Sequence, residues 1–173
     1  MLSQGISQKN KLFRTKQMGI EIERKFLVTG DDWRILARGT AYRQGYLNHD
    51  KKRTVRIRTM DDRGFITVKG MSNGLTRMEF EYEIPLEDAN ILLNTLCEKP
   101  LIEKNRFKIE FGGYTWEVDE FFDENKGLII AEIELESEDQ QFAKPPWVGE
   151  EVSSEPRYFN SNLTREPFTS WNK

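Results

Sequence analysis

Polar and apolar residues alternate along most of the chain, which predicts β-strands because successive side chains of a strand point to opposite faces. Turn segments at 60–64, 71–74 and 111–114 separate several of these strands in hairpin order. This order favours an antiparallel barrel or sandwich. The predicted strands are residues 19–28, 41–48, 53–60, 64–70, 75–84, 101–110, 113–120 and 128–136.

The helices that the sequence predicts are few and short. Asp31 or Asp32 is a candidate N-cap for a short amphipathic turn. The stretch 85–98 predicts the longest helix, because acidic residues come early and Pro100 follows. Its expected apolar stripe consists of Ile91, Leu92, Leu93 and Leu96. The expected fold is therefore dominated by β-structure (α+β), with a few flanking helices.

Other segments lie outside the predicted strands. Ser137 and Gln140 have the spacing of a capping box, which predicts the start of another short helix. The stretch 145–163 is rich in proline and aromatic residues, and we expect it to wrap around the domain and plug it. Residues 1–18 are polar and basic, and we expect a flexible tail before a single domain at 19–173.

Composition narrows the class of protein. The 173 residues, 37% hydrophobic and 12% aromatic, can form one packed domain and are too apolar for a disordered chain. The 26 basic and 29 acidic residues nearly cancel, so no nucleic-acid partner is expected. No apolar run reaches the roughly 18 residues of a membrane helix, and no membrane partner is expected. The single cysteine, Cys97, excludes an intrachain disulfide and fits a cytoplasmic location.

Charged residues gather on one face of at least seven predicted strands. The ordinary interpretation is a solvated outer face, but the helices and the aromatic C-terminal stretch would then have no apolar surface to cover. Turning the apolar faces outward and the charges into a wide, wet lumen removes this difficulty. The inward set would be Glu21, Glu23, Lys25, Arg56, Arg58, Lys69, Arg77, Glu79, Glu81, Glu83, Lys104, Arg106, Glu117, Asp119, Glu132 and Glu134. Arg24, on the opposite face, is expected to be an ordinary outer residue.

A lumen that holds both signs of charge has few uses. Arg and Lys on several walls suit a chain of phosphates, since guanidinium binds phosphate oxygens bidentately and ammonium acts as a point charge. Carboxylates would repel such an anion unless a cation lies between them, and hard oxygen ligands are what Mg²⁺ or Mn²⁺ prefers. The pattern therefore favours a site that combines carboxylates, metal, phosphates and basic groups.

The same constellation resembles the CYTH superfamily, the triphosphate tunnel metalloenzymes. Its Glu-x-Glu-x-Lys signature is met at 21–25. The resemblance continues in order through 55–58, 65–70, 76–84, 104–107, 116–121, 127–135 and 145–163. It implies an eight-stranded antiparallel tunnel like that of the short bacterial single-domain members. Members hydrolyse tripolyphosphate or organic triphosphates with a divalent metal, and some form cyclic AMP from ATP.

Carried over residue by residue, the resemblance implies roles for the charged set. The implied metal ligands are Glu21, Glu23, Glu132 and Glu134. The implied triphosphate cradle is Lys25, Arg56, Arg58, Lys69, Arg77, Lys104 and Arg106, with Arg157 as a further basic residue. Glu79 and Glu81 match the acidic pair of the mid-tunnel. Catalytic roles are expected for Glu21, Glu23, Lys25, Glu81 and Glu134.

The expected activity is metal-dependent transfer of a phosphoryl group to water, with inorganic tripolyphosphate as substrate and Mg²⁺ or Mn²⁺ as cofactor. Glu81 or Glu134 would orient the water. The alternatives are an adenylate cyclase, a thiamine or nucleoside triphosphatase, and a non-catalytic module that binds polyphosphate or a nucleotide. A homodimer is left open. His49 is expected at the surface and Cys97 in the core.

Overall fold

The computed structural model describes residues 20–48, 50 and 52–171. Its strands are β1 (Ile20–Val28), β2 (Gly39–Asn48), β3 (Arg53–Met60), β4 (Arg63–Asn73), β5 (Thr76–Ile84), β6 (Ile102–Phe111), β7 (Tyr114–Phe121), β8 (Ile129–Glu134) and β9 (Val148–Glu151). Its α-helices are α1 (Leu86–Thr95) and α2 (Asn160–Leu163), and its 3₁₀ helices are η1 (Asp32–Ile35), η2 (Asp123–Asn125), η3 (Pro156–Tyr158) and η4 (Phe168–Ser170). The predicted tail 1–18, Gly19 and His49 lie outside the described residues.

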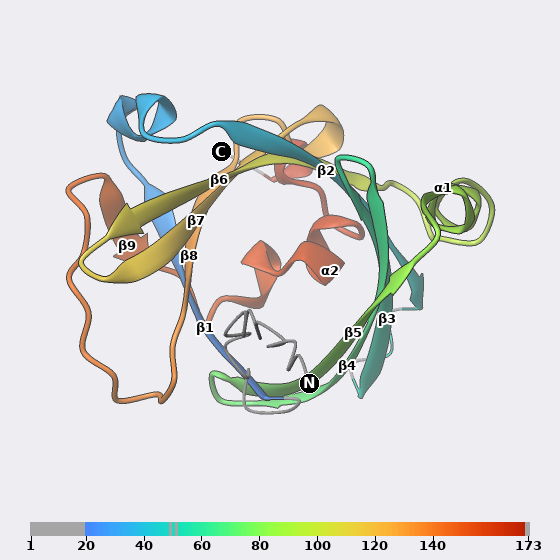
Figure 1. The fold of residues 1–173 in the computed structure, drawn as a ribbon, viewed down its shortest axis with the longest axis horizontal. Helices are drawn as coiled ribbons and strands as arrows, with labels where there is room; N and C mark the ends of the chain where they lie inside the picture. The colour runs from blue at the N-terminus through green and yellow to red at the C-terminus, as the bar shows by residue number, and fades with distance from the viewer. Residues whose placement is uncertain (1–19, 49, 51, 172–173) are drawn as a thin grey trace, which may run out of the picture.

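The strands β1 to β8 close into an antiparallel barrel, which Figure 1 shows end-on. Their order is β5, β4, β3, β2, β6, β7, β8, β1, and β1 closes the ring by pairing with β5 as well as β8. The predicted eight-stranded antiparallel barrel is therefore confirmed. The sequence did not predict β9, a short strand that pairs with β1 where Phe26 lies opposite Glu151.

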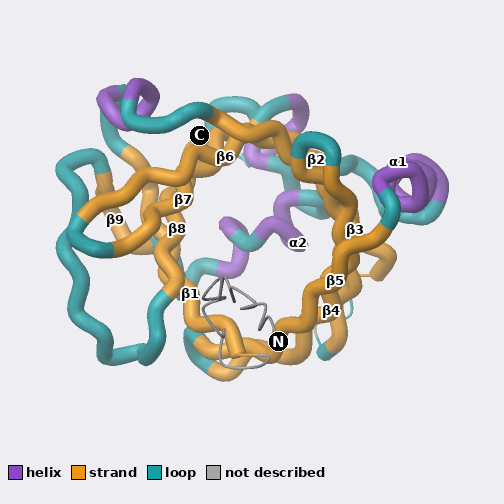
Figure 2. Tube along the Cα trace, viewed as in Figure 1, coloured by secondary structure: helices purple, strands orange, loops and turns teal. Residues whose placement is uncertain are grey.

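The largest apolar core lies outside the barrel, because the charged faces of the strands point inward. It packs the outer side of β1, β7 and β8 against Trp33 and the connection 135–147, which Figure 2 shows as a loop outside the barrel. The rings of Phe26 and Trp116, both fully buried, have centroids 5.6 Å apart. This arrangement supports the inverted barrel that the charge pattern predicts.

Two smaller clusters cover other parts of the outer surface. α1 lies on β3 and β4, where Ala89 and Leu93 pack with Ile57 and Cys97. The predicted core position of Cys97 is therefore confirmed. The C-terminal cluster consists of Ile102, Phe121, Leu128, Ile130, Val152, Tyr158 and Leu163. It anchors the C-terminal stretch against one end of β6, β7 and β8.

Some local predictions are wrong. In α1 Ile91 is 52% exposed, and Leu96, directly after α1, is 63% exposed, so the predicted apolar stripe does not face the core as a whole. Ser137 and Gln140 form a turn rather than a helix, in which the N–H of Gln140 donates to the carbonyl of Ser137. Asp31 is the N-cap of η1, yet its side chain makes no capping hydrogen bond. Among the described residues no helix is long and apolar enough to span a membrane.

The expectation that helices and the C-terminal stretch cover every apolar outer face is also wrong. On the outer side of β4 and β5, large apolar side chains lie in solvent. They are Val68, Met71, Met78, Phe80 and Tyr82. The core is therefore asymmetric, with its aromatic part beside β1, β7 and β8 and an uncovered face on the far side of the ring.

This asymmetry predicts different stability effects for two phenylalanines on outward faces. Phe26→Ala should lower the free energy of unfolding by about 3–5 kcal/mol, because Phe26 is 0% exposed and its removal leaves a cavity. Phe80→Ala, at a position 44% exposed, should lower it by less than about 1 kcal/mol. Urea unfolding of both variants measures the difference, and equal losses would contradict a core outside β1, β7 and β8.

Candidate active site

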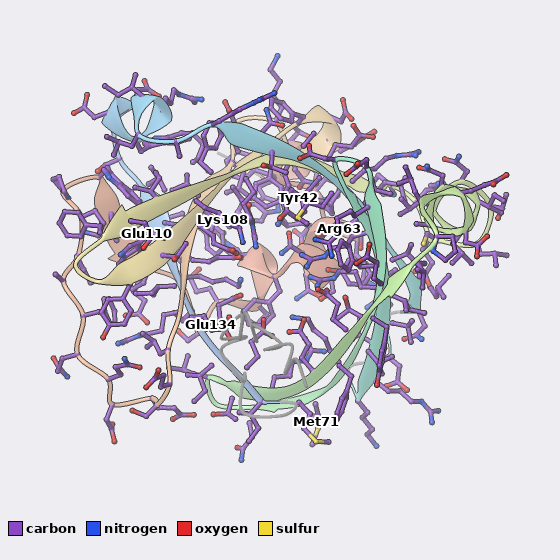
Figure 3. The ribbon with its side chains drawn as sticks, in the orientation of Figure 1. Tyr42, Arg63, Met71, Lys108, Glu110 and Glu134 are labelled. Atoms are coloured by element: carbon purple, nitrogen blue, oxygen red, sulfur yellow. The ribbon has the colours of Figure 1, made fainter. Side chains whose placement is uncertain are left out.

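The barrel encloses a cavity of about 950 Å³, and each strand from β1 to β8 contributes to its lining. Figure 3 shows Tyr42, Arg63, Lys108 and Glu134 around its opening, from β2, β4, β6 and β8. Nearly all of the predicted site residues meet here. Those that line the cavity are Glu21, Glu23, Lys25, Arg56, Arg58, Lys69, Arg77, Glu79, Glu81, Arg106, Glu132 and Glu134.

On the wall formed by β1, β6 and β8, basic and acidic side chains are paired. Lys25 donates to Glu23 and to Glu132, and Arg106 donates over 2.7 Å to the other oxygen of Glu132. The register explains the contact, since Lys25 lies opposite Glu132 in the β1–β8 pair. Burial lowers the pKa of Lys25, but the charges of Glu132 and Glu23 outweigh it and hold that pKa above its ordinary value. Lys25 is therefore a firmly charged group in the lumen.

The two carboxylates beside Lys25 differ in their readiness to ionise. Burial raises the pKa of Glu132, but Lys25 and Arg106 outweigh it and hold that pKa well below its ordinary value. The pKa of Glu23 is raised, first by burial and then by the negative charge of Glu132. The site thus holds two crowded carboxylates whose mutual repulsion a further cation would relieve.

A buried layer supports this wall from behind. Asp119, fully buried, accepts hydrogen bonds of 2.7 and 2.6 Å from Arg106 and one of 2.5 Å from Lys104. Lys104, which the resemblance implies as part of the cradle, is not in the cavity lining. Burial, together with the charge of Arg106, lowers the pKa of Lys104 to about 8 although Asp119 opposes the shift. Asp119 therefore fixes the guanidinium of Arg106 at the edge of the lumen.

The opposite wall, formed by β3, β4 and β5, repeats the pairing of charges. Arg58 donates to Glu81 over 2.8 Å, and the hydroxyl of Thr67 donates to the other oxygen of Glu81 over 2.7 Å. Lys69 bridges Glu21 at 2.7 Å and Glu79 at 2.9 Å, so it joins β1 to β5 across the barrel seam. Burial raises the pKa of Glu79, but hydrogen bonds and the charge of Lys69 outweigh it and bring that pKa to about 2.

Some guanidinium N–H groups on this second wall have no charged acceptor, and others have no acceptor at all among the described residues. The Nε atoms of Arg56 and Arg58 are buried without a hydrogen-bond partner among the described residues. Arg77 donates to the carbonyl of Gly70 and the hydroxyl of Thr54, which are both neutral. Burial lowers the pKa of Arg58 and of Arg77. Because an unmet buried donor is costly, these guanidinium groups favour an anion in the lumen.

The acidic set fits a divalent metal ion by its chemistry. Its members supply carboxylate oxygens, and Glu23 lies directly opposite Glu134 in the β1–β8 pair, where like charges repel unless a cation lies near. Within the described ranges, however, no three acidic, histidine or cysteine side chains are already grouped as a metal site. Lys25 holds both Glu23 and Glu132 instead. Metal binding would therefore require these ion pairs to open.

Sequence reasoning missed several lining residues. Tyr42 and Tyr46 reach the cavity from alternate positions of β2, so the period of two was a usable signal. Lys108 lies on the same face of β6 as Lys104 and Arg106, and pairs with Glu117 at 3.0 Å. The C-terminal stretch contributes Ser153, Phe159, Asn160 and Ser161. Figure 1 shows α2 within the outline of the ring, which agrees with the expected plug.

Arg157 does not join the basic set of the lumen. It is exposed, and its guanidinium lies over the rings of Tyr158 and Trp171 at 5.1 and 4.3 Å from their centroids. Its predicted place among the basic residues of the tunnel is therefore wrong.

Comparisons with known proteins agree with the fold and the site. A model of the CYTH domain matches residues 19–166. An inorganic triphosphatase of Acetivibrio thermocellus is 56% identical over 154 residues, 89% of this chain and 99% of that protein. An inorganic triphosphatase of Nitrosomonas europaea is 37% identical over 148 residues, 83% of this chain and 95% of that protein. A crystal structure of an inorganic triphosphatase matches with a TM-score of 0.59 and 33% identity over 83% of this chain and 93% of that one.

The fold and the site define a closed barrel whose tunnel is lined by paired charges. The chain belongs to the CYTH family, because the family model covers nearly all of the described residues and the relatives are similar over most of their length.

The buried position of Lys104 predicts a pH dependence of stability. The pKa of Lys104 is about 8 in the folded protein and 10.5 for an ordinary lysine, the value that applies to the unfolded chain. Below pH 8 the side chain is charged in both states, so the loss of stability from burying its charge is fully present there. As the pH rises from 8 to 10.5 the folded protein releases this proton before the unfolded chain does, and the free energy of unfolding should rise by about 3 kcal/mol. The comparison is with Lys104→Met, which removes the titrating group.

The measurement is urea unfolding of both proteins between pH 7 and about pH 10.5. The wild-type free energy of unfolding minus that of Lys104→Met should increase over this range. A difference that stays constant or falls would contradict the lowered pKa of Lys104.

Proposed function

We propose that this protein hydrolyses a phosphoanhydride bond of a triphosphate in a reaction that depends on a divalent metal ion. Inorganic tripolyphosphate is the first candidate substrate, and pyrophosphate and phosphate are the products. The observation that carries the proposal is the lumen, in which Arg and Lys side chains from facing walls surround a cavity together with a set of carboxylates. The relatives that bear the name inorganic triphosphatase support the same substrate.

Binding would exchange the partners of the ion pairs in the lumen. Guanidinium groups such as Arg58 and Arg106 would turn their N–H groups to phosphate oxygens, which they bind bidentately. The buried Nε of Arg58, which has no hydrogen-bond partner within the described part of the chain, supports this exchange because a phosphate oxygen would satisfy it. Lys25 and Lys69 would add point charges from β1 and β4. The carboxylates that these groups release would then be available as metal ligands.

Glu21, Glu23, Glu132 and Glu134 are the residues that would hold the metal ion. When bound, Mg²⁺ or Mn²⁺ supplies Lewis acidity and neutralises charge on the phosphate chain. A carboxylate, Glu81 or Glu134, would accept a hydrogen bond from the attacking water and orient it. The oxygen of this water forms the new bond to phosphorus, its proton passes to the carboxylate, and the bridging P–O bond breaks. The basic walls stabilise the charge on the leaving pyrophosphate, which can take up the proton.

Two alternatives from the sequence stay open within the proposal. A cyclase or an organic triphosphatase would use the same phosphate cradle but needs room for a base or a thiazole at the opening. A binding module would use the basic walls alone and gains nothing from carboxylates, so the crowded pair of Glu23 and Glu132 favours an enzyme. A homodimer, a cytoplasmic location and the absence of nucleic-acid and membrane partners also stay predictions.

The central prediction is metal-dependent release of phosphate from tripolyphosphate. With Mg²⁺ or Mn²⁺ the protein should hydrolyse this substrate, and a chelator should abolish the reaction. Glu23→Ala and Lys25→Ala should each lower kcat/KM by about a hundredfold or more, because each removes a charge that contacts metal or phosphate. Glu150→Ala and Lys126→Ala, at exposed positions, serve as matched controls and should keep the wild-type rate.

A panel of triphosphates measured with each metal separates the alternatives. Faster turnover of ATP, with cyclic AMP and pyrophosphate as products, would favour a cyclase. Tight binding of tripolyphosphate without phosphate release would favour a binding module. Wild-type rates in Glu23→Ala and Lys25→Ala would show that the lumen is not the active site.

Metal ligands and phosphate ligands should also respond differently. Glu21→Gln should raise the metal concentration for half-maximal rate by about tenfold, because an amide is a weaker ligand than a carboxylate. Arg58→Lys should instead raise KM for tripolyphosphate by about tenfold, because an ammonium group cannot form the bidentate contact. Initial rates over a grid of metal and substrate concentrations measure both effects, with Glu124→Gln as the exposed control. The reverse pattern would contradict the two assignments.

A further inference from the structure

Arg24, expected to be an ordinary outer residue, makes a specific contact on the outside of the barrel. Its guanidinium donates to both oxygens of Glu151 in β9, at 2.8 and 2.9 Å, and lies 5.4 Å from the ring centroid of Phe142. Burial raises the pKa of Glu151, but hydrogen bonds from Arg24 and Ser153 outweigh it and hold that pKa below its ordinary value. The pair is therefore charged and has the fork geometry of a strong ion pair.

Ser153 connects this ion pair to the backbone of the lumen strand. Its hydroxyl donates to Glu151 over 2.8 Å and accepts the backbone N–H of Lys25 over 2.9 Å. The N–H of Val152 donates over 2.8 Å to the carbonyl of Lys25. Both backbone groups of Lys25 are thus held by the residues that directly follow β9.

The location of this contact matters because β1 changes partners there. On the edge away from β8, β1 pairs with β5 as far as Ile22 and with β9 from Phe26 onward. The residues between them, 23–25, are the last three of the signature, and a serine side chain takes the place of a strand at Lys25. On this edge the backbone of Lys25 is therefore held by Ser153 and Val152 rather than by a strand, while the ladder with β8 continues on the other edge.

We propose that Arg24, Glu151 and Ser153 form a latch that positions Lys25 for the triphosphate. Arg24 fixes the carboxylate of Glu151, Glu151 orients the hydroxyl of Ser153, and Ser153 holds the N–H of Lys25. The Lys25 ammonium is thereby kept at the point between Glu23 and Glu132 where it meets the cavity. The latch rests on the proposed function, since its effect is on a residue that binds the substrate. We assign the three side chains as positioning residues, which act on the substrate through Lys25.

The proposal also predicts which nearby residues should have no effect on the rate of hydrolysis. Ser154 follows Ser153 directly but is exposed. Arg34 forms an ion pair of 2.8 Å with Glu120 on the outer side of β7. Glu120 directly follows the buried Asp119 in the sequence, just as Arg24 directly precedes Lys25. Among the described residues, neither Ser154 nor Arg34 forms a side-chain hydrogen bond to the backbone of a lumen residue. They are matched controls for the loss of a hydroxyl and of an outer ion pair.

The test measures kcat/KM for tripolyphosphate with Mg²⁺. Ser153→Ala and Arg24→Met should each lower it by about tenfold, because a small displacement of a binding group is costly in rate. Ser154→Ala, at an exposed position, and Arg34→Met, at a half-buried position outside the lumen, should stay within about twofold of wild type. Arg24→Lys, which keeps the charge but not the fork, should fall between Arg24→Met and wild type. Equal rates in Ser153→Ala and Ser154→Ala, with both folded by circular dichroism, would overturn the latch.

A double-mutant cycle separates positioning from a general structural role. The dissociation constant of tripolyphosphate is measured by calorimetry in the wild type, Ser153→Ala, Lys25→Met and the double variant. If Ser153 acts through Lys25, Ser153→Ala should weaken binding in the wild type and have no further effect in Lys25→Met. The same loss in both backgrounds would overturn the proposal, because it would mean that Ser153 acts on the fold at large.

The two proposals can fail separately. Binding without hydrolysis by the wild type would refute the proposed function, while the calorimetric cycle would still decide the latch. Hydrolysis with identical behaviour of Ser153→Ala and Ser154→Ala would refute the latch and leave the function standing. Absence of both binding and hydrolysis would refute both, because Lys25 would then have no substrate to meet.

Discussion

The structure depends on the rule that a charge taken out of water must have a partner. Lys25, Arg106 and Lys104 are buried in the walls of the barrel, and each is bonded to a carboxylate that is buried with it. Strand register provides these partners, since Lys69 lies opposite Glu79 and Arg106 opposite Asp119. Each sign of charge in the lumen therefore offsets part of the cost of burying the other.

The same rule bears on the proposed binding of a phosphate chain and a metal ion. Groups that satisfy one another in the free protein are those that a phosphate chain and a metal ion would satisfy in the complex. Binding then exchanges partners rather than creating charges, so the barrel need not be rebuilt. Asp119 stays out of this exchange, because it is fully buried and holds Arg106 from behind.

The sequence predicts the barrel and most of the lumen for one physical reason. The side chains of a strand alternate strictly between its two faces, so residues 21, 23 and 25 must share one face. The charge patterns of the other strands decide whether this face points into the barrel or out of it. Alternation does not tell how far along the barrel axis a side chain lies, and so does not tell whether it reaches the cavity. Lys104 and Arg106 share a face of β6, yet only Arg106 reaches the cavity. The resemblance to the CYTH superfamily added roles for the residues, which alternation alone cannot assign.

Contacts from irregular segments were beyond the reach of the sequence. β9, Ser153 and the cavity residues of α2 follow a proline-rich stretch in which no period marks an inner or outer face. Arg24 looked unremarkable for the same reason, because its partner Glu151 lies 127 residues away in that stretch. The predicted helix shows a related failure, since the spacing of apolar residues did not reveal that Leu96, directly after α1, lies in solvent.

β1 shows how stability and function can be divided between the two faces of one strand. Its inner face carries Glu21, Glu23 and Lys25, whose buried charges oppose folding until they are paired. Its outer face carries Phe26, which packs with Trp116 in the main core and favours folding by removing apolar surface from water. The inverted barrel thus supplies from outside the free energy that a charged interior requires. The lumen is consequently free to be polar, because the stability of the fold does not have to come from its interior.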